Sequence, residues 1–373
     1  MKTIVVEARH LSRGTGISKY FELYLDKFIN SHPHYNYIFV TDSTKNLYKY
    51  KNYSNVNIKK LSSPNWIKHP YLNDLYYGII SFPTFLKNQN ADLLISPYYD
   101  FIIPRKLYNK VIITIHDLCY YECNTLYKTH TKIPANYFLT NALNNCAGVL
   151  TVSKTSYKKI KLYFPEITQK KRVIVTYNCF SKPNFNFKQN ILPQEIISKH
   201  GKKLLYSGGF ENRKNLSRLF RAFYQVTQEY GDLYMIITGN LINNIKFYRL
   251  IHSCGINEKI LLPGNITDDQ MQTLYQSGIT GAVNLSLCEG FGRNSYEALL
   301  NGLPLLCSDI EINREIVGDY PIYCDPTNVE DIINGLKKLV KTSANESLSS
   351  IDERFTIDYN FTNFSNLIDD CMK

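Results

Sequence analysis

The sequence of 373 residues contains no run of about 18 apolar residues, so no segment is expected to span a membrane. Its first ten residues, MKTIVVEARH, reach Glu7 after a short apolar stretch and predict a buried strand, not a signal peptide. The nine cysteines include no C-x-x-C pair, which argues against a zinc site and predicts reduced thiols. A Walker loop, H-E-x-x-H, G-x-S-x-G and the metal–diphosphate motif Asp-x-Asp are also absent.

Acidic residues are scarce in the first half of the chain. Residues 1–180 hold 24 Lys/Arg and 10 Asp/Glu, a net charge of +14, whereas residues 181–373 hold 19 and 22, a net charge of −3. A basic half favours a polyanionic partner, such as an anionic lipid surface or a phosphorylated substrate, but it is also compatible with an ordinary lysine-rich surface. No nucleic-acid-binding module is recognisable, so nucleic acid is not an expected partner.

The chain is too long for one core and alternates apolar β-branched runs with amphipathic stretches. In the first half, strands are expected at TIVVEA, YIFVT, ADLLIS, KVIITIH, GVLTVS and RVIVTY, and helices at 16–30, 71–87, 134–146 and 153–163. Residues 179–194 have two prolines and no clear period, which predicts a linker. The alternation then restarts, with strands at KKLLYSG, LYMIITG, KILLPG, GAVNLS, PLLCS and PIYCD. This pattern predicts an α/β protein of two Rossmann-like domains facing a central cleft.

The segment 286–319 carries the richest chemistry. A strand ends near Ser286, Gly290-Phe291-Gly292 forms a turn, and a helix follows. The free N–H groups at such a helix start favour a phosphate. Glu289 and Glu297 lie eight residues apart across this turn and can reach opposite ends of one bound molecule. The alternative is that Glu289 caps the helix and Glu297 lies on its solvated face.

Three other loops follow predicted strands. The segment 204–223 passes from a strand into a Gly-containing loop with Arg213 and Lys214, followed by a helix that Asn215 is placed to cap. The two cations suit a diphosphate, although ordinary surface cations are the alternative. Near the amino terminus, Gly14 and Gly16 form G-x-G, a weak dinucleotide signal.

His116 follows the strand KVIITI, where ligands of an open α/β sheet bind. Although a lone histidine is more often structural, this position makes it a candidate functional residue.

Taken together, these segments resemble family 4 retaining glycosyltransferases of the GT-B fold, the glycosyl transferases group 1 with an E-x7-E motif. The resemblance covers nearly the whole chain and is carried in order by GTGISKY, TIHDL, GVLTVSKTSYKKI, GGFENRKNLSRLFRAF, LLPGNITDDQMQTLYQSG, EGFGRNSYEALLNGLPLLCSDIEINREIVGD and the tail RFTIDYNFTNFSNLIDDCMK. It implies an acceptor-binding domain at 1–180, a nucleotide-sugar-binding domain at 181–355, and a helix at 356–373 that crosses back onto the first domain.

The resemblance also implies roles by position. Glu289 contacts the hydroxyls of the donor sugar, Glu297 holds the ribose, and His116 lies beneath the sugar. The implied catalytic residues are Glu289, His116, Arg213 and Lys214. The implied donor-binding residues are Gly14, Gly16, Gly209, Arg213, Lys214, Gly290, Phe291, Gly292, Arg293, Asn294 and Glu297. No cofactor or metal is expected, because Arg213 and Lys214 would stabilise the leaving diphosphate.

Arg293 and Asn294 stand where many relatives have apolar residues, so the donor cannot be carried over from any relative. The expected activity is retaining transfer of a hexose-type sugar from GDP-mannose or a UDP- or dTDP-sugar to a glycan acceptor, lipid-linked, in surface polysaccharide synthesis of the O-antigen, lipopolysaccharide or capsule kind. Transfer to a soluble acceptor such as a sugar phosphate, and a non-catalytic nucleotide-sugar-binding subunit, are the alternatives. A cytoplasmic location, peripheral at the inner face of the membrane, is expected from the basic stretch 153–172, which holds seven Lys/Arg and one Glu.

Overall fold

A computed structural model describes residues 2–181, 192, 196, 198–239, 241, 244–343 and 350–373. The chain forms two compact units, an N-terminal unit of Met1–Phe180 with Asp352–Lys373 and a C-terminal unit of Ser181–Ile351. Most of the predicted linker at 179–194 lies outside the described residues.

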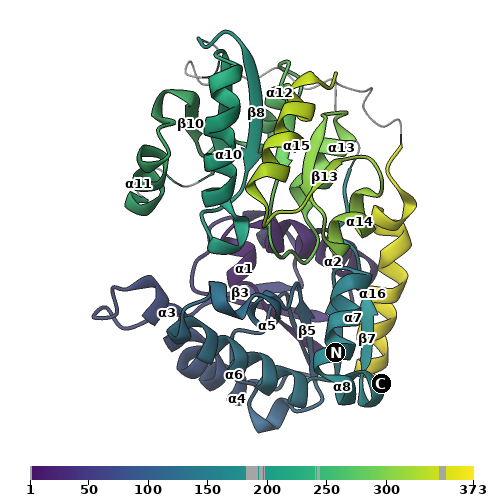
Figure 1. The fold of residues 1–373 in the computed structure, drawn as a ribbon. Helices are drawn as coiled ribbons and strands as arrows, with labels where there is room; N and C mark the ends of the chain where they lie inside the picture. Colours follow the sequence, from purple (N-terminus) through teal and green to yellow (C-terminus); the bar gives the residue numbers. More distant parts are fainter. Residues whose placement is uncertain are drawn as a thin grey trace. The chain divides into compact units, whose positions relative to one another are not determined.

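The N-terminal unit is built on a parallel sheet in the order β3-β2-β1-β4-β5-β6-β7 (Figure 1). Its strands are β1 (Thr3–Glu7), β2 (Asn36–Thr41), β3 (Val56–Lys60), β4 (Leu93–Ser96), β5 (Val111–Ile115), β6 (Gly148–Thr151) and β7 (Arg172–Val175). All were predicted except β3, an edge strand of sequence VNIKK with no buried residue. The exposure of β3 explains why the sequence did not predict it, because an edge strand does not need the apolar run by which a buried strand is recognised.

The helices of this unit are α1 (Arg9–Ser12), α2 (Gly16–Ser31), α3 (Pro70–Tyr76), α4 (Phe82–Lys87), α5 (Cys119–Glu122), α6 (Thr129–Asn145), α7 (Lys154–Tyr163), α8 (Pro165–Lys170) and α16 (Ile357–Met372). A π-helical turn, η2 (Tyr77–Ser81), joins α3 to α4, and short 3-10 turns are η1 (Tyr48–Asn52), η3 (Arg105–Leu107), η4 (Asn124–Leu126) and η7 (Glu353–Phe355). Helix α1, in the predicted first loop, was not foreseen.

Helix α6 begins five residues before the predicted start at Pro134 and contains this proline in its interior. Proline has no N–H to donate to the carbonyl four residues earlier, which here belongs to His130. The Tyr71 hydroxyl donates a hydrogen bond to this carbonyl at 2.6 Å. A partner from α3 therefore satisfies the group that Pro134 leaves without an intrahelical donor.

The C-terminal helix α16 belongs to the N-terminal unit, which confirms the predicted return of the tail to the first domain. Phe364 of α16 packs against Tyr24 of α2, with ring centroids 4.9 Å apart. The buried side chain of Asn360 accepts a hydrogen bond from the N–H of Tyr177 at 2.9 Å and donates to the carbonyls of Arg354 and Thr356 at 2.7 and 2.9 Å. One amide thus ties α16 to the chain that follows β7.

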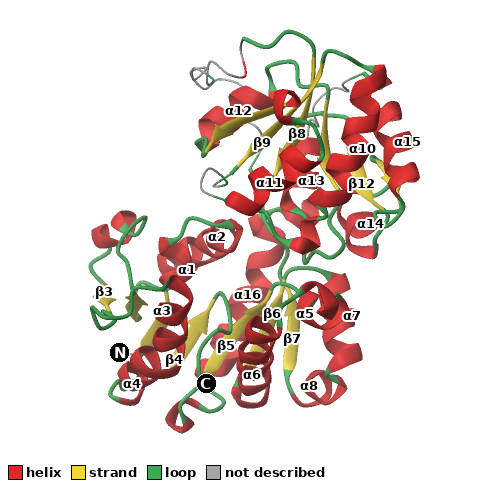
Figure 2. Ribbon diagram, turned by 60° about the vertical axis from the view of Figure 1, so that its left-hand side comes forward, coloured by secondary structure: helices red, strands yellow, loops and turns green. Residues whose placement is uncertain are grey.

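The C-terminal unit has a second parallel sheet, in the order β10-β9-β8-β11-β12-β13 (Figure 2). Its strands are β8 (Lys202–Ser207), β9 (Leu233–Thr238), β10 (Ile260–Gly264), β11 (Gly281–Asn284), β12 (Leu305–Ser308) and β13 (Ile322–Cys324). Its helices are α10 (Leu216–Glu229), α11 (Ile245–Ser253), α12 (Asp268–Tyr275), α13 (Arg293–Leu300), α14 (Glu311–Val317) and α15 (Val329–Lys341), with 3-10 turns η5 (Asn212–Lys214) and η6 (Asn257–Lys259). The predicted two-sheet α/β architecture is confirmed.

In the part of the chain that the structure describes, no helix combines the length and the apolar character needed to cross a bilayer. Seven cysteines are free thiols: Cys123, Cys146, Cys179, Cys254, Cys307, Cys324 and Cys371.

Replacing Asn360 by alanine is expected to lower the free energy of unfolding by about 1–3 kcal/mol, because the change removes the three hydrogen bonds of a buried amide to backbone groups. Denaturant titration of the whole protein measures this loss. Asn363→Ala, at an exposed position of the same helix, serves as the control and should change stability by less than about 0.5 kcal/mol. Equal stability of the two variants would contradict the anchoring role of Asn360.

Candidate functional site

The two sheets each reverse their strand order at one point, and loops leave the carboxyl edge on both sides of it. In the C-terminal unit the reversal lies between β8 and β11, which pair in parallel through Leu204–Gly281 and Leu205–Ala282. The loops 208–215 and 285–292 therefore begin side by side. Ligands of open α/β sheets bind at such a reversal, and most of the predicted site residues lie in these two loops.

Glu289 lies at the centre of this site, with its side chain about nine-tenths buried. Its Oε2 is 3.0 Å from Nη1 of Arg213, and its Oε1 is 2.5 Å from Nζ of Lys214. The hydroxyl of Ser286 donates a further hydrogen bond to Oε1 at 2.8 Å. Folding thus brings Glu289 into direct contact with two cations that lie 76 and 75 positions earlier in the sequence.

The charge state of Glu289 follows from these contacts. Burial of its carboxyl raises the pKa, but the ammonium of Lys214 and the guanidinium of Arg213 outweigh burial and lower the pKa to about 2. The carboxyl group is therefore ionised throughout the physiological range. Arg213 also donates from Nε to Glu211 at 2.6 Å, so its guanidinium is held by Glu211 as well as by Glu289.

Backbone and side-chain bonds fasten the two loops to each other. The N–H of Leu287 donates to the carbonyl of Arg213 at 2.7 Å, and the side chain of Asn294 donates to the carbonyl of Ser207. Because these bonds join residues on both loops, the positions of Arg213 and Lys214 relative to the start of α13 are fixed by the fold of this unit.

Helix α13 begins after Gly292, whose φ of 82° lies in the left-handed region that favours glycine. The N-cap position is Gly292, which has no side chain, and the Glu289 carboxylate is held instead by Arg213, Lys214 and Ser286. Its first N–H groups lie at the positive end of the helix dipole, and that of Ser295 donates to the carbonyl of Gly292 at 3.0 Å. Gly290 and Phe291 are buried in the turn that precedes it.

Glu297 is held apart from the Glu289 group. Its Oε1 accepts from Nη2 of Arg293 at 3.1 Å and its Oε2 from the hydroxyl of Tyr275 at 3.3 Å. Its side chain is 23% exposed and is thus partly solvated while it holds these two partners. The carboxylate remains open enough to accept a ligand hydroxyl.

Two further predictions on the loop after β8 have different outcomes. Asn215 occupies the position before α10 with a φ of 60°, but its side chain makes no capping bond. It donates instead to the carbonyl of Pro326 at 2.7 Å, so the predicted cap is wrong. The carbonyl of Gly209 accepts a hydrogen bond from the hydroxyl of Tyr206 at 2.8 Å, which orders the glycine loop.

The remaining predicted residues belong to the N-terminal unit. Gly14 has a φ of 63°, and a Cβ at this position would lie 3.0 Å from the side-chain nitrogen of Asn46, so conformation and space both favour glycine. Gly16 is the first residue of α2. His116 follows β5, and its ring lies edge-on to Tyr20 at 5.3 Å between centroids.

The protonation of His116 follows from its surroundings. Its Nε2 lies 2.9 Å from the carbonyl of Pro97, which only accepts, so Nε2 carries the proton and Nδ1 the lone pair. Burial lowers the pKa of the imidazole to about 4, against the opposing effect of the Pro97 carbonyl. A neutral ring suits hydrogen bonding to a hydroxyl better than charge stabilisation of an oxocarbenium centre.

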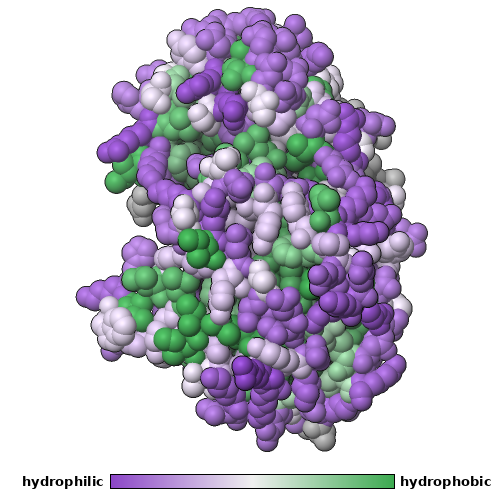
Figure 3. Space-filling view, turned by 60° about the horizontal axis from the view of Figure 1, so that its bottom comes forward, coloured by the Kyte–Doolittle hydropathy of each residue, from purple (hydrophilic) through white to green (hydrophobic). Residues whose placement is uncertain are grey.

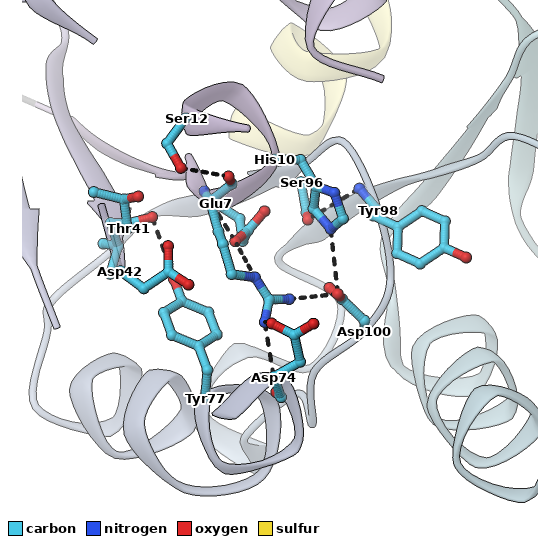
Figure 4. Close-up of polar contacts among 12 residues, drawn as sticks. Glu7, His10, Ser12, Thr41, Asp42, Asp74, Tyr77, Ser96, Tyr98 and Asp100 are labelled. Carbon is cyan, nitrogen blue, oxygen red and sulfur yellow. Dashed lines mark hydrogen bonds and ion pairs between the residues drawn. The ribbon is translucent and has the colours of Figure 1, made fainter. Parts of the chain in front are cut away.

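A buried ion cluster at the carboxyl edge of this sheet was missed by the sequence analysis. Arg9, fully buried, lies 3.6 Å from Glu7, pairs with Asp100, and stands 4.3 Å above the ring of Tyr77. His10 lies 3.2 Å from Asp100. Three of the carboxylates labelled in Figure 4, those of Glu7, Asp74 and Asp100, pair with Arg9. The available signal was a set of charged residues directly after β1 and β4.

This cluster lies where the order of the N-terminal sheet reverses, between β1 and β4. Burial opposes the charge on Arg9, but Asp100 and Glu7 outweigh burial and raise its pKa. Arg13, next to Gly14, pairs with Asp74, which also lies 3.6 Å from Arg9. The cluster thus fixes the start of the glycine loop.

Comparison with known proteins agrees with this architecture. The model of the family "Glycosyl transferases group 1" matches residues 187–354, the part that holds the Glu289 site. O-antigen chain mannosyltransferase B of Escherichia coli is 27% identical over 62% of this chain and 61% of its own length. Residues 187–354 thus match the group 1 glycosyl transferases, the family that the sequence analysis predicted.

Other similar proteins extend the comparison. O-antigen chain mannosyltransferase RfbU of Salmonella typhimurium is 23% identical over 69% of this chain and 67% of its own length. The chain thus spans about two thirds of the length of these curated relatives. The sucrose-phosphate synthase of Thermosynechococcus elongatus is 13% identical, with a TM-score of 0.67 over 99% of each chain. This likeness confirms the GT-B fold, while the sugar, the acceptor and the residue roles stay predictions.

The low pKa of His116 predicts a pH dependence of stability. Between pH 6.5 and about 4 the unfolded chain binds a proton at this imidazole and the folded chain does not, so the free energy of unfolding should fall as the pH falls through this range. His116→Gln should lose this part of the slope, and His34→Gln, at an exposed position, should keep it. Denaturant titrations from pH 7 to 4 measure both, and identical slopes in wild type and His116→Gln would rule the assignment out.

Proposed function

We propose that the protein is a retaining, metal-independent glycosyltransferase that moves a hexose from a nucleotide-diphosphate sugar to a glycan acceptor in surface polysaccharide synthesis. The observation that carries this proposal is the contact of Arg213 and Lys214 with the buried carboxylate of Glu289. Breaking the glycosidic bond of such a donor leaves negative charge on a diphosphate, and preorganised cations stabilise it.

The contacts with Glu289 hold both cations in fixed positions before a diphosphate binds. Glu289 neutralises part of their charge and holds both side chains at about one-sixth exposure or less. The rotamer entropy of these long side chains is therefore lost on folding and not on donor binding. Arg213 supplies a planar fork and Lys214 a compact charge, which suits the oxygens of two linked phosphates.

The start of α13 provides a second element for the same ligand. The N–H groups that follow Gly292 favour an anion. Asn294 fastens this helix start to the end of β8, so the helix N-terminus and the two cations belong to one ordered region. Glu297, 3.3 Å from the Tyr275 hydroxyl, is the residue proposed to accept the ribose hydroxyls.

The donor proposed first is GDP-mannose, because the curated relatives include two O-antigen chain mannosyltransferases. A UDP- or dTDP-sugar is the alternative donor, and the acceptor is proposed to be lipid-linked. His116, neutral and with its lone pair on Nδ1, would accept a hydrogen bond from a sugar hydroxyl. The anomeric configuration is retained if the acceptor attacks the sugar from the face that the diphosphate leaves, with the donor phosphate taking the proton of the acceptor hydroxyl.

The double change Arg213→Ala with Lys214→Ala should weaken nucleoside-diphosphate binding by about 100-fold or more, because each lost charged hydrogen bond is worth about 1.5–3 kcal/mol. Calorimetry with GDP, UDP and dTDP measures the affinity and identifies the base. Arg221→Ala with Lys246→Ala removes equal charge from exposed positions of the same unit and should bind as wild type. Unchanged affinity of the Arg213/Lys214 variant would refute the phosphate role.

Glu289→Gln should leave the protein folded and able to bind a nucleoside diphosphate, but should lower kcat/KM for transfer by about 100-fold or more, because the charge that positions both cations is removed. Transfer from the identified donor is assayed in excess EDTA, where wild type should keep its activity. Glu258→Gln, at an exposed position, is the matched control. The proposal is wrong if Glu289→Gln turns over as fast as wild type. If the wild-type protein binds the donor but neither transfers nor hydrolyses its sugar, the alternative of a non-catalytic subunit is favoured.

A further inference from the structure

Six large apolar side chains of the N-terminal unit are exposed on neighbouring elements. We call them the apolar patch; they are Trp66 (78% exposed), Leu72 (54%), Ile79 (45%), Ile80 (48%), Ile133 (65%) and Tyr137 (57%). Single exposed apolar residues are normal on a protein surface, but a group of six on neighbouring elements favours an interaction surface.

The patch is not an unfinished part of the core, because the helices that carry it already have a buried side. In the continuous helix formed by α3, η2 and α4, the core side includes Tyr77, Phe82 and Leu86. Leu72, Ile79 and Ile80 are spaced i, i+7 and i+8 along the same helix, which places them on one stripe. The helix therefore has a second apolar side that the core does not use.

Helix α6 shows the same division. Phe138, Leu139, Ala142 and Leu143 of α6 lie in the same core cluster as the buried side of α3–α4. Ile133 and Tyr137, one helical turn apart, are exposed. The bond from Tyr71 to His130 joins α3 to α6, so the two helices are neighbours on one face of the sheet. Figure 3 shows hydrophobic side chains gathered over this part of the unit.

The segments that carry the patch are rich in cations. Residues 64–88 and 128–145, which carry it, contain Lys68, Lys87, Lys128 and Lys132 but only one acid, Asp74. Asp74 pairs with Arg13 and Arg9. Within the described residues none of the four lysines forms an ion pair, so the surroundings of the patch are positive.

The basic stretch 153–172, singled out from the sequence, is less available than its composition suggests. Lys159 pairs with Glu122 at 2.6 Å, Lys170 with Glu166 at 2.9 Å, and Arg172 with Asp370. Lys171 donates to the carbonyl of Cys146. Four of its seven cations are thus engaged within the protein.

From these observations we propose that the apolar patch, and not the stretch 153–172, docks the protein onto a bilayer that contains anionic lipid. Tryptophan and tyrosine favour the membrane interface, aliphatic side chains enter the acyl boundary, and flanking lysines meet the phosphate groups. Trp66 follows Pro64 in a turn closed by the bond from Ile67 N–H to the Pro64 carbonyl at 2.9 Å, so its ring stands at a projecting site. The inference rests on the proposed function only in that a lipid-linked acceptor explains why a membrane is needed.

Because Trp66 is the one tryptophan of the chain, its fluorescence reports on this surface alone. Vesicles of phosphatidylcholine with 30% phosphatidylglycerol are added to the full-length protein, with excitation at the red edge of the tryptophan band. The expected result is a blue shift of the emission, quenching by brominated lipid, and loss of both at high salt. Vesicles of phosphatidylcholine alone should give a much smaller effect.

Co-sedimentation with the same vesicles compares matched variants. Ile79→Ser with Ile80→Ser, and separately Lys128→Glu with Lys132→Glu, should each lower the bound fraction at least fivefold. Leu162→Ser, at a 72% exposed position in the stretch 153–172, and Ile245→Ser, 67% exposed in the C-terminal unit, should bind as wild type. Thermal unfolding of each variant shows whether it is folded.

Three results would overturn the proposal. Binding to vesicles without any change in Trp66 emission would place the contact on another surface, as would loss of binding in Leu162→Ser alone. Absence of vesicle binding by wild type, together with a dimer that Ile79→Ser/Ile80→Ser converts to monomer, would show that a second copy covers the patch. Calorimetry with nucleoside diphosphates on the same samples separates this failure from failure of the proposed function, since donor binding needs the Glu289 site alone.

Discussion

The pairing of one buried carboxylate with two cations organises the C-terminal unit around its site. Glu289 is about nine-tenths buried, and a charge in that position is stable only with partners at hydrogen-bond distance, here Arg213, Lys214 and Ser286. The two loops that carry these residues leave adjacent parallel strands, β8 and β11. The reversal of strand order thus brings the two loops together, and the ion contacts fix the positions of their side chains. A diphosphate arriving at this site meets cations whose positions have already been set by folding.

The N-terminal unit uses the same physical solution at its own reversal. Between β1 and β4 the buried cation is Arg9, and its partners are Glu7 and Asp100. Here the signs are exchanged, since one cation is held by several carboxylates. The consequence is local: α1 and the residues before Gly14 are fixed, so the glycine loop starts from a rigid base. A buried network of this kind holds a unique geometry at the cost of desolvating every charge in it. In each unit, therefore, the buried ion cluster lies at the edge of the sheet where ligands of such sheets bind, and removal of one partner there would leave a buried charge unpaired.

Most of the fold could be predicted because central parallel strands must be apolar on both sides. Runs such as TIVVE and VIITI are readable for that reason, while the edge strand VNIKK carries no such requirement. Long-range partners account for what the sequence did not reveal. The early start of α6 depends on Tyr71, more than fifty residues earlier, and the true partners of Glu289 lie 75 and 76 residues away. Local rules instead favoured a helix cap at Glu289 and at Asn215, because capping is the nearest use for such side chains.

Charge counted along the sequence also gives a wrong impression of which surface is positive, because it ignores the ion pairs that form in the folded protein. The N-terminal unit holds 26 Lys/Arg and 15 Asp/Glu, and the C-terminal unit holds 17 of each, so the excess is real. Yet cations of the densest basic stretch pair with Glu166 four residues away and with Glu122 and Asp370, which only folding brings near. Four lysines without ion pairs among the described residues lie instead in the two segments that carry exposed apolar side chains. Attraction to an anionic surface falls off within a Debye length and gives no fixed orientation, whereas apolar insertion requires a particular face. The apolar patch, and not the charge total, is therefore the feature that would determine how this unit meets a membrane.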